Sequence, residues 1–380
     1  MAASKNTRAK NRSSSAAPAV GELLFEIGTE ELPYQFVPLA LTSLRESAER
    51  LFKEYRLTHG QIRVLGTPRR VTLLVEALAA RQAPIVKEVM GPSKAVAYDA
   101  SGTPTRALLG FMAGQQTELK DLEVRQTPKG EYVCAVKRDA GHPTADALSD
   151  LLPQLIGSLS FPKSMRWNET GVKFARPIRW LLALYAGRVV KFQLAGVAAA
   201  NRTWGHRFLS GSSRSSRQGM PVKDGKSYLK VLEQHGVVPD PDARRAMILD
   251  QIETLAKSAH GSLHRDEELL EQAIYTVECP QAILGAFNPE YLSVPKEVLM
   301  TAMKEHQGFF SLVTKAGSLL PAFISVTNMK LRDMRLIREG NERVLAARLA
   351  DAKFFFDEDR KIKLVDRVEK LQGMTFHQKL

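Results

Sequence analysis

The sequence predicts an α+β protein with more than one domain, mixed sheets and a helical insertion. Its 380 residues are 44% apolar and 25% charged, which is enough for large cores and for two or three domains. Strand and helix patterns occur throughout, without the strict strand-helix-strand alternation of a doubly wound sheet. We expect four segments: a disordered basic tail (1–20), an N-terminal α+β domain (21–209), a mainly helical insertion or arm (210–270), and an α+β segment ending in a long helix (271–380).

The expected tail has four basic residues, a run of three serines and no acidic residue. This composition predicts disorder, because too little apolar surface is available for burial. An organelle transit peptide has a similar composition, although this segment is short for one. We favour a solvated tail and keep targeting as the alternative.

The N-terminal domain begins with a strand in which Leu23, Phe25 and Ile27 occupy alternate positions before a Gly-Thr turn. A helix at about 36–56 carries five apolar residues on one face: Leu41, Leu44, Ala48, Leu51 and Phe52. Further along, the patterns predict strands at 62–65, 71–75 and 131–136 and helices at 105–114 and 145–156.

The second half of the chain shows helical spacing at 226–259, and it then predicts strands at 274–277, 282–284 and 323–327, with a helix at 296–303. The last long helix is expected at 338–360, begun by Gly340-Asn341 and carrying an apolar stripe of Val344, Leu345, Leu349, Ala352 and Phe356. Arg348 and Asp351 are three residues apart and can pair on its outer face. We interpret this helix as structural.

A formal charge of +13 favours a polyanionic partner, because a field of that sign attracts phosphate over a long distance. No apolar run approaches the roughly 20 residues that span a bilayer, and no secretory signal is evident, so we expect neither membrane insertion nor export. Cys134 and Cys279 are far apart, which argues against a disulfide framework and a thiolate metal cluster. We therefore expect a reducing, cytoplasmic location.

The turn at 66–70 places Arg69 and Arg70 side by side between two strands. Two adjacent guanidinium groups in a turn can bind RNA phosphate, or they can simply be solvated. Both interpretations stay open from the sequence.

Arginine and aromatic residues are interleaved at 161–167, 174–180 and 201–208. Such clusters can bind RNA, since guanidinium groups contact phosphate and rings stack on unpaired bases. Alternatively, Trp167 and Trp180 are core anchors. The tRNA-binding candidates are Arg69, Arg70, Lys163, Arg166, Arg176, Arg179, Arg202, His206 and Arg207, and we expect Arg166, Arg176, Arg179, Arg202 and Arg207 on one basic face.

Motifs for catalysis fail on inspection. Gly225-Lys226-Ser227 resembles the end of a phosphate-binding loop, but the required first glycine position is Met220. His260 and His264 are four residues apart, yet Gly261 and Ser262 predict a loop between them, so solvated residues are the better interpretation. We predict no catalytic residue and no metal site in this chain.

Five motifs together resemble one family, the beta subunit of bacterial tetrameric glycyl-tRNA synthetase. They stand at 25–33, 68–70, 165–167, 205–208 and 340–356, in the order that the family has them. The resemblance covers about residues 21–380. The family's chain continues well beyond the position matching Leu380, so the sequence resembles its N-terminal portion, and anticodon recognition is not carried over.

The resemblance implies an α2β2 glycine-tRNA ligase in which the alpha subunit binds ATP and magnesium and carries out adenylation. The beta subunit would bind tRNA(Gly), would hold no cofactor itself and would be required for attachment of glycine in translation. The resemblance also implies a B3/B4-like module, related to one that edits mischarged tRNA in the phenylalanyl enzyme. We do not transfer editing, because no amino acid smaller than glycine exists for a size sieve to admit. The alternative function is a stand-alone RNA-binding or aminoacyl-tRNA editing module.

Overall fold

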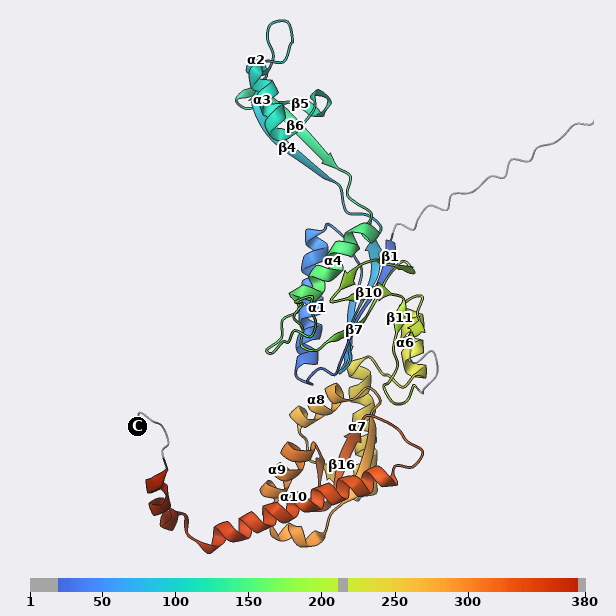
Figure 1. Ribbon diagram of the computed structural model, residues 1–380, viewed down its shortest axis with the longest axis vertical. Helices are drawn as coiled ribbons and strands as arrows, with labels where there is room; N and C mark the ends of the chain where they lie inside the picture. Colours follow the sequence, from blue (N-terminus) through green and yellow to red (C-terminus); the bar gives the residue numbers. More distant parts are fainter. Residues whose placement is uncertain (1–19, 211–217, 375–380) are drawn as a thin grey trace, which may run out of the picture.

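The computed structural model describes residues 20–210 and 218–374 and has the predicted multi-domain α+β architecture. Its three larger sheets follow one another along the long axis, with three strands at one end, seven in the middle and four at the other end (Figure 1). The expected tail lies outside the described residues except for Val20, which begins the first strand. Within the described ranges, no helix is long and apolar enough to cross a membrane.

The seven-stranded sheet, called the large sheet below, has the order β2-β3-β1-β7-β10-β9, with β8 paired to β7. The central strand β1 is antiparallel to both β3 and β7, so it is hydrogen-bonded along both edges. The strands are β1 (Val20–Thr29), β2 (Ile62–Thr67), β3 (Arg70–Ala79), β7 (Ile178–Tyr185), β8 (Arg188–Val189), β9 (Gln193–Leu194) and β10 (Val197–Ala200).

Helices α1 (Phe36–Glu54) and α4 (Thr144–Ser158) cover one face of the large sheet (Figure 1). The five apolar residues predicted on one face of the first helix are all buried there, as are Leu23, Phe25 and Ile27 of β1. Because side chains alternate along a strand, Leu24 and Glu26 point to the opposite face. That face packs against α6 (Gly225–Gln234), so both faces of β1 are buried.

Residues 85–139 form a separate three-stranded sheet, called the small sheet below, that stands away from the large sheet on two connecting segments (Figure 1). Its order is β4-β6-β5, and α2 and α3 pack on it around Ala97, Leu108 and Val133. The sequence predicted the middle strand and the longer helix but missed the two outer strands. The elements are β4 (Ile85–Ser93), α2 (Lys94–Ala97), α3 (Arg106–Gln115), η1 (Leu119–Asp121), β5 (Leu122–Thr127) and β6 (Gly130–Asp139).

The four-stranded sheet, called the C-terminal sheet below, has the order β13-β15-β16-β14. Helices α7 and α8 cover one face, and α9 and α10 cover the other. The elements are α7 (Pro241–Ser258), β13 (Ser262–Leu263), α8 (Glu267–Thr276), β14 (Gln281–Ala286), η2 (Pro289–Ser293), α9 (Lys296–Gln307), β15 (Phe310–Val313), β16 (Leu319–Thr327), α10 (Arg335–Lys361) and η3 (Leu364–Gly373).

The predicted strand at 274–277 is wrong, because residues up to Thr276 belong to α8. Asp266 caps this helix by accepting from the Leu269 backbone N–H at 3.0 Å, a start signal that the strand assignment overlooked. The segment 210–270 is mainly helical in its described part, but it forms no separate arm: α6 packs on the large sheet, and α7 packs on the C-terminal sheet. A short pair, β11 (Arg202–Thr203) with β12 (Met220–Pro221), flanks α6.

The last long helix begins earlier than predicted. α10 starts at Arg335, so Gly340 and Asn341 lie inside it, and the Asn341 side chain donates to Ser325 Oγ at 2.9 Å instead of capping the helix. Leu345 and Leu349 are fully buried, as predicted, whereas Val344 is exposed. In the described contacts Arg348 and Asp351 are both exposed and form no ion pair, so the predicted pairing is wrong.

Candidate functional site

Three of the sequence motifs meet at one end of the large sheet. The backbone N–H of Thr29 donates to the Arg69 carbonyl at 2.8 Å, which joins the motif at 25–33 to that at 68–70. Arg69 Nη1 donates to the Gly205 carbonyl at 3.4 Å, and Arg207 Nη1 lies 3.4 Å from Glu31 Oε1, which adds the motif at 205–208. Residues nearly 180 positions apart therefore form one local site.

Gly28 provides the space for a tryptophan at this site. It pairs with Trp180 across β1 and β7, and a Cβ atom on residue 28 would lie 1.8 Å from Cε2 of the Trp180 ring. The ring instead lies against the bare backbone, and its Nε1 donates to Glu26 Oε1 at 2.7 Å. Trp180 is 4% exposed, so the core interpretation of this residue is confirmed.

Arg70 is the centre of a buried charge cluster. Its side chain is fully buried, and Nη2 lies 3.1 Å from Glu278 Oε1, while Nη1 lies 3.5 Å from Glu26 Oε1. Nη1 also donates to the Trp204 carbonyl at 2.8 Å. The prediction that Arg70 presents its guanidinium to RNA phosphate is therefore wrong, because that group is enclosed by protein partners. Arg70 is the first residue of β3, and its alternation in the strand turns it inward.

The two buried carboxylates in this cluster differ in acidity. Burial raises the pKa of Glu26, and the positive charge of Arg70 offsets this only in part. Burial by itself would raise the pKa of Glu278 too, but Arg70 and a hydrogen bond from Thr67 Oγ1 at 2.7 Å bring it below its ordinary value. Arg70 therefore interacts more closely with Glu278 than with Glu26. Of the two carboxyl groups, Glu26 is the weaker acid.

Glu278 lies between α8 and β14, just before that strand of the C-terminal sheet, so the cluster also joins two parts of the molecule. Its backbone is held there by Asn328 Oδ1, which accepts from the Glu278 N–H at 2.6 Å. A second buried cation also joins these two parts: Arg244 of α7 donates to the Gly66 carbonyl of β2 at 2.7 Å. Burial lowers the pKa of Arg244 to about 10. These contacts fix the C-terminal sheet against the end of the large sheet.

Some buried polar atoms around the cluster have no hydrogen-bond partner in the described protein: Thr29 Oγ1, Arg69 Nε, His206 Nε2 and Glu278 Oε2. His206 Nδ1 accepts from the backbone N–H groups of Phe208 and Leu209, each at 3.2 Å, so the neutral ring carries its proton on Nε2. These four atoms include nitrogen donors and oxygen acceptors, a combination with which ordered water can form hydrogen bonds. His206 is 1% exposed, so the predicted contact between its ring and tRNA is not accessible.

Above the cluster, three of the predicted arginines gather around two glutamates on the surface. Arg179 Nε lies 3.3 Å from Glu30 Oε1, and Arg207 pairs with Glu30 as well. Arg176 Nε donates to the Glu31 carbonyl at 3.2 Å. The expected basic face therefore brings Arg176, Arg179 and Arg207 together, but Glu30 and Glu31 neutralise much of its charge.

Of the remaining candidates, three are exposed outside this group and Arg69 lies in the buried cluster. Arg202 is exposed, and its Nη1 donates to the Gly219 carbonyl at 2.8 Å. Lys163 and Arg166 are exposed in the connection between α4 and β7, and neither takes part in a described ion pair. Arg69 is mostly buried beside Glu278, at 4.0 Å between Nη1 and Oε2, so it too is not the free phosphate ligand that the turn predicted.

Glu26, Glu278 and Arg244 are the site residues that the sequence interpretation missed. Glu26 offered a signal, since it is an acidic residue inside the apolar run Leu23 to Ile27. A charge at such a position has to be exposed, paired or neutral. Glu278 and Arg244 offered none, because their partners lie far away in sequence.

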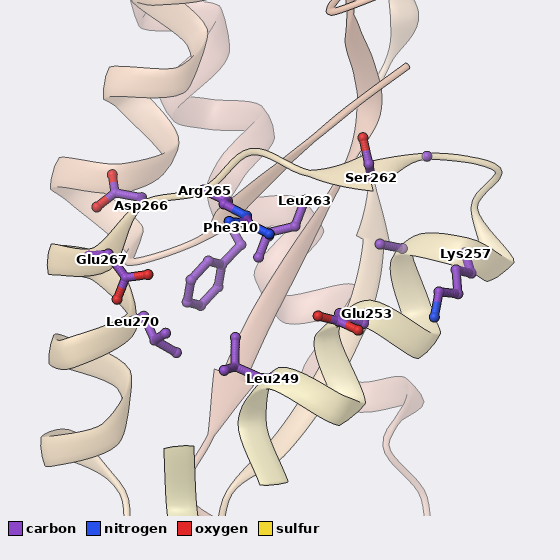
Figure 2. Close-up of a pocket in the computed structure, with 12 residues that line it drawn as sticks. Leu249, Glu253, Lys257, Ser262, Leu263, Arg265, Asp266, Glu267, Leu270 and Phe310 are labelled. Atoms are coloured by element: carbon purple, nitrogen blue, oxygen red, sulfur yellow. The ribbon is translucent and has the colours of Figure 1, made fainter. Parts of the chain in front are cut away.

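A cavity of about 450 Å³ lies on the C-terminal sheet, away from the charge cluster. Figure 2 shows Phe310 at its centre, with Leu249 and Leu270 close by. Charged residues of both signs surround this apolar floor: Glu253, Lys257, Arg265, Asp266 and Glu267. Asp266 is already engaged, since it caps α8 and lies 2.9 Å from Lys304 Nζ. This mixture indicates no particular ligand.

Comparison with known proteins gives one family. The model of the glycyl-tRNA synthetase beta subunit family matches residues 23–380. The glycine-tRNA ligase beta subunit of Citrifermentans bemidjiense is 46% identical over 359 residues, which is 94% of this chain and 51% of the relative. The corresponding subunit of Geobacter sulfurreducens is 43% identical over the same shares of the two chains. The chain thus spans about half the length of the relatives that it matches.

Proposed function

The chain belongs to the glycyl-tRNA synthetase beta subunit family, and from this we propose that it contributes to tRNA binding in a glycine-tRNA ligase without carrying out adenylation. The family match over residues 23–380 is the observation that carries the proposal. The expected substrate is tRNA(Gly), which would receive glycine in an ATP-dependent reaction. The name of the relatives, a beta subunit, favours a chain that works with a second subunit over a stand-alone module.

The charge cluster supports a positioning role for this part of the enzyme. Its buried carboxylates are paired with Arg70 or hydrogen-bonded, and the cluster joins the large sheet to the C-terminal sheet. Such an arrangement holds a surface in a fixed shape, which a tRNA-binding subunit requires.

The connection between α4 and β7 supplies the best candidates for phosphate contact. Lys163, Arg166 and Lys173 are exposed there, and none takes part in an ion pair in the described part of the chain. Cations without an acidic partner can exchange counterions for phosphate at no cost in broken ion pairs. Arg179 and Arg207 would first have to leave Glu30.

The partner in this proposal is the alpha subunit, in an α2β2 enzyme in the cytoplasm. ATP and magnesium belong to that subunit, where adenylation would take place. This division agrees with the lack of adenylation motifs in the sequence.

The test uses a hybrid beta subunit, in which this chain replaces the matching half of the Citrifermentans bemidjiense protein, together with the alpha subunit of that organism. We expect no ATP–pyrophosphate exchange from the chain alone and glycine attachment to tRNA(Gly) from the hybrid with alpha. Binding of the hybrid to alpha in size-exclusion chromatography reports that it is folded. A hybrid that binds alpha but does not support charging contradicts the proposal.

The isolated chain also decides the alternative. If it hydrolyses mischarged tRNA without the alpha subunit, the editing module is correct. If it activates glycine by itself, the assignment of adenylation to the alpha subunit is wrong.

A further inference from the structure

The small sheet carries two lysines directly opposite each other. Lys87 of β4 faces Lys137 of β6 in the antiparallel register, and both residues are exposed. Directly opposite residues have their Cβ atoms about 4.5–5.5 Å apart, so like charges at such a position repel each other and weaken the sheet. A local rule broken in this way, without a stabilising gain in the free chain, is expected at a functional site.

The other face of the same sheet obeys the rule. Arg125 Nη2 of β5 lies 2.6 Å from Glu88 Oε1 of β4 and 2.9 Å from Glu123 Oε2. Arg138 Nη2 of β6 lies 2.6 Å from Glu123 Oε1. Glu88 and Arg138 directly follow the two lysines in the sequence, so alternation along the strands places them on the opposite face. The charges of that face are therefore paired with opposite charges.

No carboxylate is paired with the two lysines in the described part of the chain. Neither Lys87 nor Lys137 takes part in an ion pair there. Asp139 lies on the same face, two positions from Lys137, but it is already engaged. Its Oδ2 lies 2.5 Å from Arg56 Nη2, and its Oδ1 accepts from the Gly141 N–H at 2.8 Å. The two ammonium groups are therefore available to an anion from solvent.

The position of the lysine pair in the fold makes it accessible to a large ligand. Lys87 and Lys137 stand near the strand ends that connect to the large sheet, whereas α2 and α3 lie toward the far end of the small sheet (Figure 1). The small sheet itself stands away from the large sheet (Figure 1). Because the pair is exposed on a projecting part of the chain, an extended polyanion can pass over it.

Building on the proposed function, we propose that Lys87 and Lys137 bind one phosphate group of the tRNA(Gly) backbone between them. The small sheet is then a second contact surface, besides the connection between α4 and β7. A phosphate between two ammonium groups replaces their repulsion by two charge-assisted hydrogen bonds. The occupant is a nucleic-acid phosphate because the pair offers only cationic donors and the whole chain, at +13, attracts polyanions.

This assignment gives stability and binding opposite requirements. Lys137→Glu places opposite charges across the two strands, so it should strengthen the small sheet while it removes the phosphate contact. Hydrogen exchange measured by mass spectrometry on residues 85–93 and 130–139, at about 20 mM salt, reports the stability of these strands. We expect slower exchange in Lys137→Glu than in the original chain. Faster exchange would overturn the proposal, because the two lysines would then stabilise the sheet without any ligand.

Binding is measured by fluorescence anisotropy with tRNA(Gly) over a series of salt concentrations. Lys87→Ala/Lys137→Ala should reduce the log–log salt slope by about two and weaken binding about tenfold at about 0.1 M salt. Lys94→Ala/Arg125→Ala is the matched control, since it also removes two exposed cations from the small sheet. These two are paired with Glu131 at 2.9 Å and with Glu88, so the slope should change little.

The outcomes separate this inference from the proposed function. If the original chain binds tRNA(Gly) and Lys87→Ala/Lys137→Ala keeps the same slope, this inference is wrong and the proposed function stands. If the original chain does not bind tRNA(Gly), both are wrong. In the original chain, tRNA(Gly) should also slow hydrogen exchange in 85–93 and 130–139. Equal protection by inorganic phosphate, at the same concentration of phosphate groups, would assign the pair to a small anion and overturn the contact with RNA.

Discussion

Arg70 and Glu278 form a buried ion pair, 3.1 Å between Nη2 and Oε1, although 208 residues separate them in the sequence. Arg70 begins a strand of the large sheet, and Glu278 precedes a strand of the C-terminal sheet. The pair therefore fixes how the two sheets meet. Glu26 lies on the other side of the same guanidinium, so one cation serves two carboxylates.

Replacement of Glu278 by glutamine should destabilise the protein on the order of 3 kcal/mol at pH 7, because it leaves the buried Arg70 without its closer anionic partner. Urea unfolding followed by tryptophan fluorescence measures the change, since Trp180 lies in the cluster. Glu54→Gln is the control: Glu54 pairs with Arg50 on the exposed side of α1 at 3.0 Å, and its loss should cost less than about 1 kcal/mol. Equal effects of the two substitutions would contradict the buried pair.

The two buried carboxylates should give opposite pH dependence. The pKa of Glu278 is lowered, so its stabilisation is present above the unfolded value of about 4.3 and is lost as pH falls through the folded value. The pKa of Glu26 is raised, so its contribution is present below about 4.3 and is lost as pH rises through the folded value. As pH rises from about 4 to about 8, the free energy of unfolding of Glu26→Gln should increase relative to the original chain, and that of Glu278→Gln should decrease. The measurement is repeated at pH intervals of about one unit. Unfolding free energies that stay parallel for the two variants would exclude this assignment.

The sequence could predict elements whose signal is local. The buried face of α1 follows from five apolar residues at helical spacing, and all five are buried. The charge cluster could not be predicted in this way. Alternation places Glu26 opposite Phe25 on β1, but it does not say that α6 and the C-terminal sheet bury that second face. The turn between β2 and β3 was likewise predicted from local residues. The burial of the Arg70 side chain was not, because it depends on Glu278, which lies far away in the sequence.

Leu349→Ala should reduce the free energy of unfolding by about 2–5 kcal/mol, because Leu349 is fully buried against α9 and the C-terminal sheet. Arg348→Ala should change it by less than about 0.5 kcal/mol, since this residue is exposed and has no described ionic partner. Thermal and urea unfolding of both variants provide the measurement. A large loss in the arginine variant would indicate a partner for Arg348 that this account does not contain.

Gly28→Ala should destabilise the large sheet by several kcal/mol, because the new methyl group would overlap the Trp180 ring, which is fixed by its hydrogen bond to Glu26. Gly157→Ala is the matched control in α4: its Cβ would meet nothing within 4 Å, and alanine is the better helix former by up to about 1 kcal/mol. Differential scanning calorimetry should show a lower melting temperature for the first variant only. Similar melting of the two would contradict the packing of Trp180 on Gly28.

The helix boundaries show a further limit of the sequence. Gly340-Asn341 is a reasonable start signal, yet α10 continues through it from Arg335. Contacts with the C-terminal sheet outweigh the local preference, since Asn341 binds Ser325 and Glu342 Oε1 accepts from the Ala286 N–H at 3.0 Å. Exposed Phe354 and Phe355 likewise depart from the rule that large apolar residues face the core.

The central claim is that this chain binds tRNA through exposed cations, and the salt dependence of binding tests it most directly. Affinity for tRNA(Gly) is measured by fluorescence anisotropy at several salt concentrations for the original chain and for Lys163→Ala/Arg166→Ala/Lys173→Ala. A matched triple variant, Lys257→Ala/Lys296→Ala/Lys315→Ala, removes three exposed lysines near the C-terminal sheet that have no described ionic partner. We predict weaker binding and a log–log salt slope reduced by about one for each lost contact in the first variant, with little change in the second. An unchanged slope and affinity in the first variant would contradict the claim.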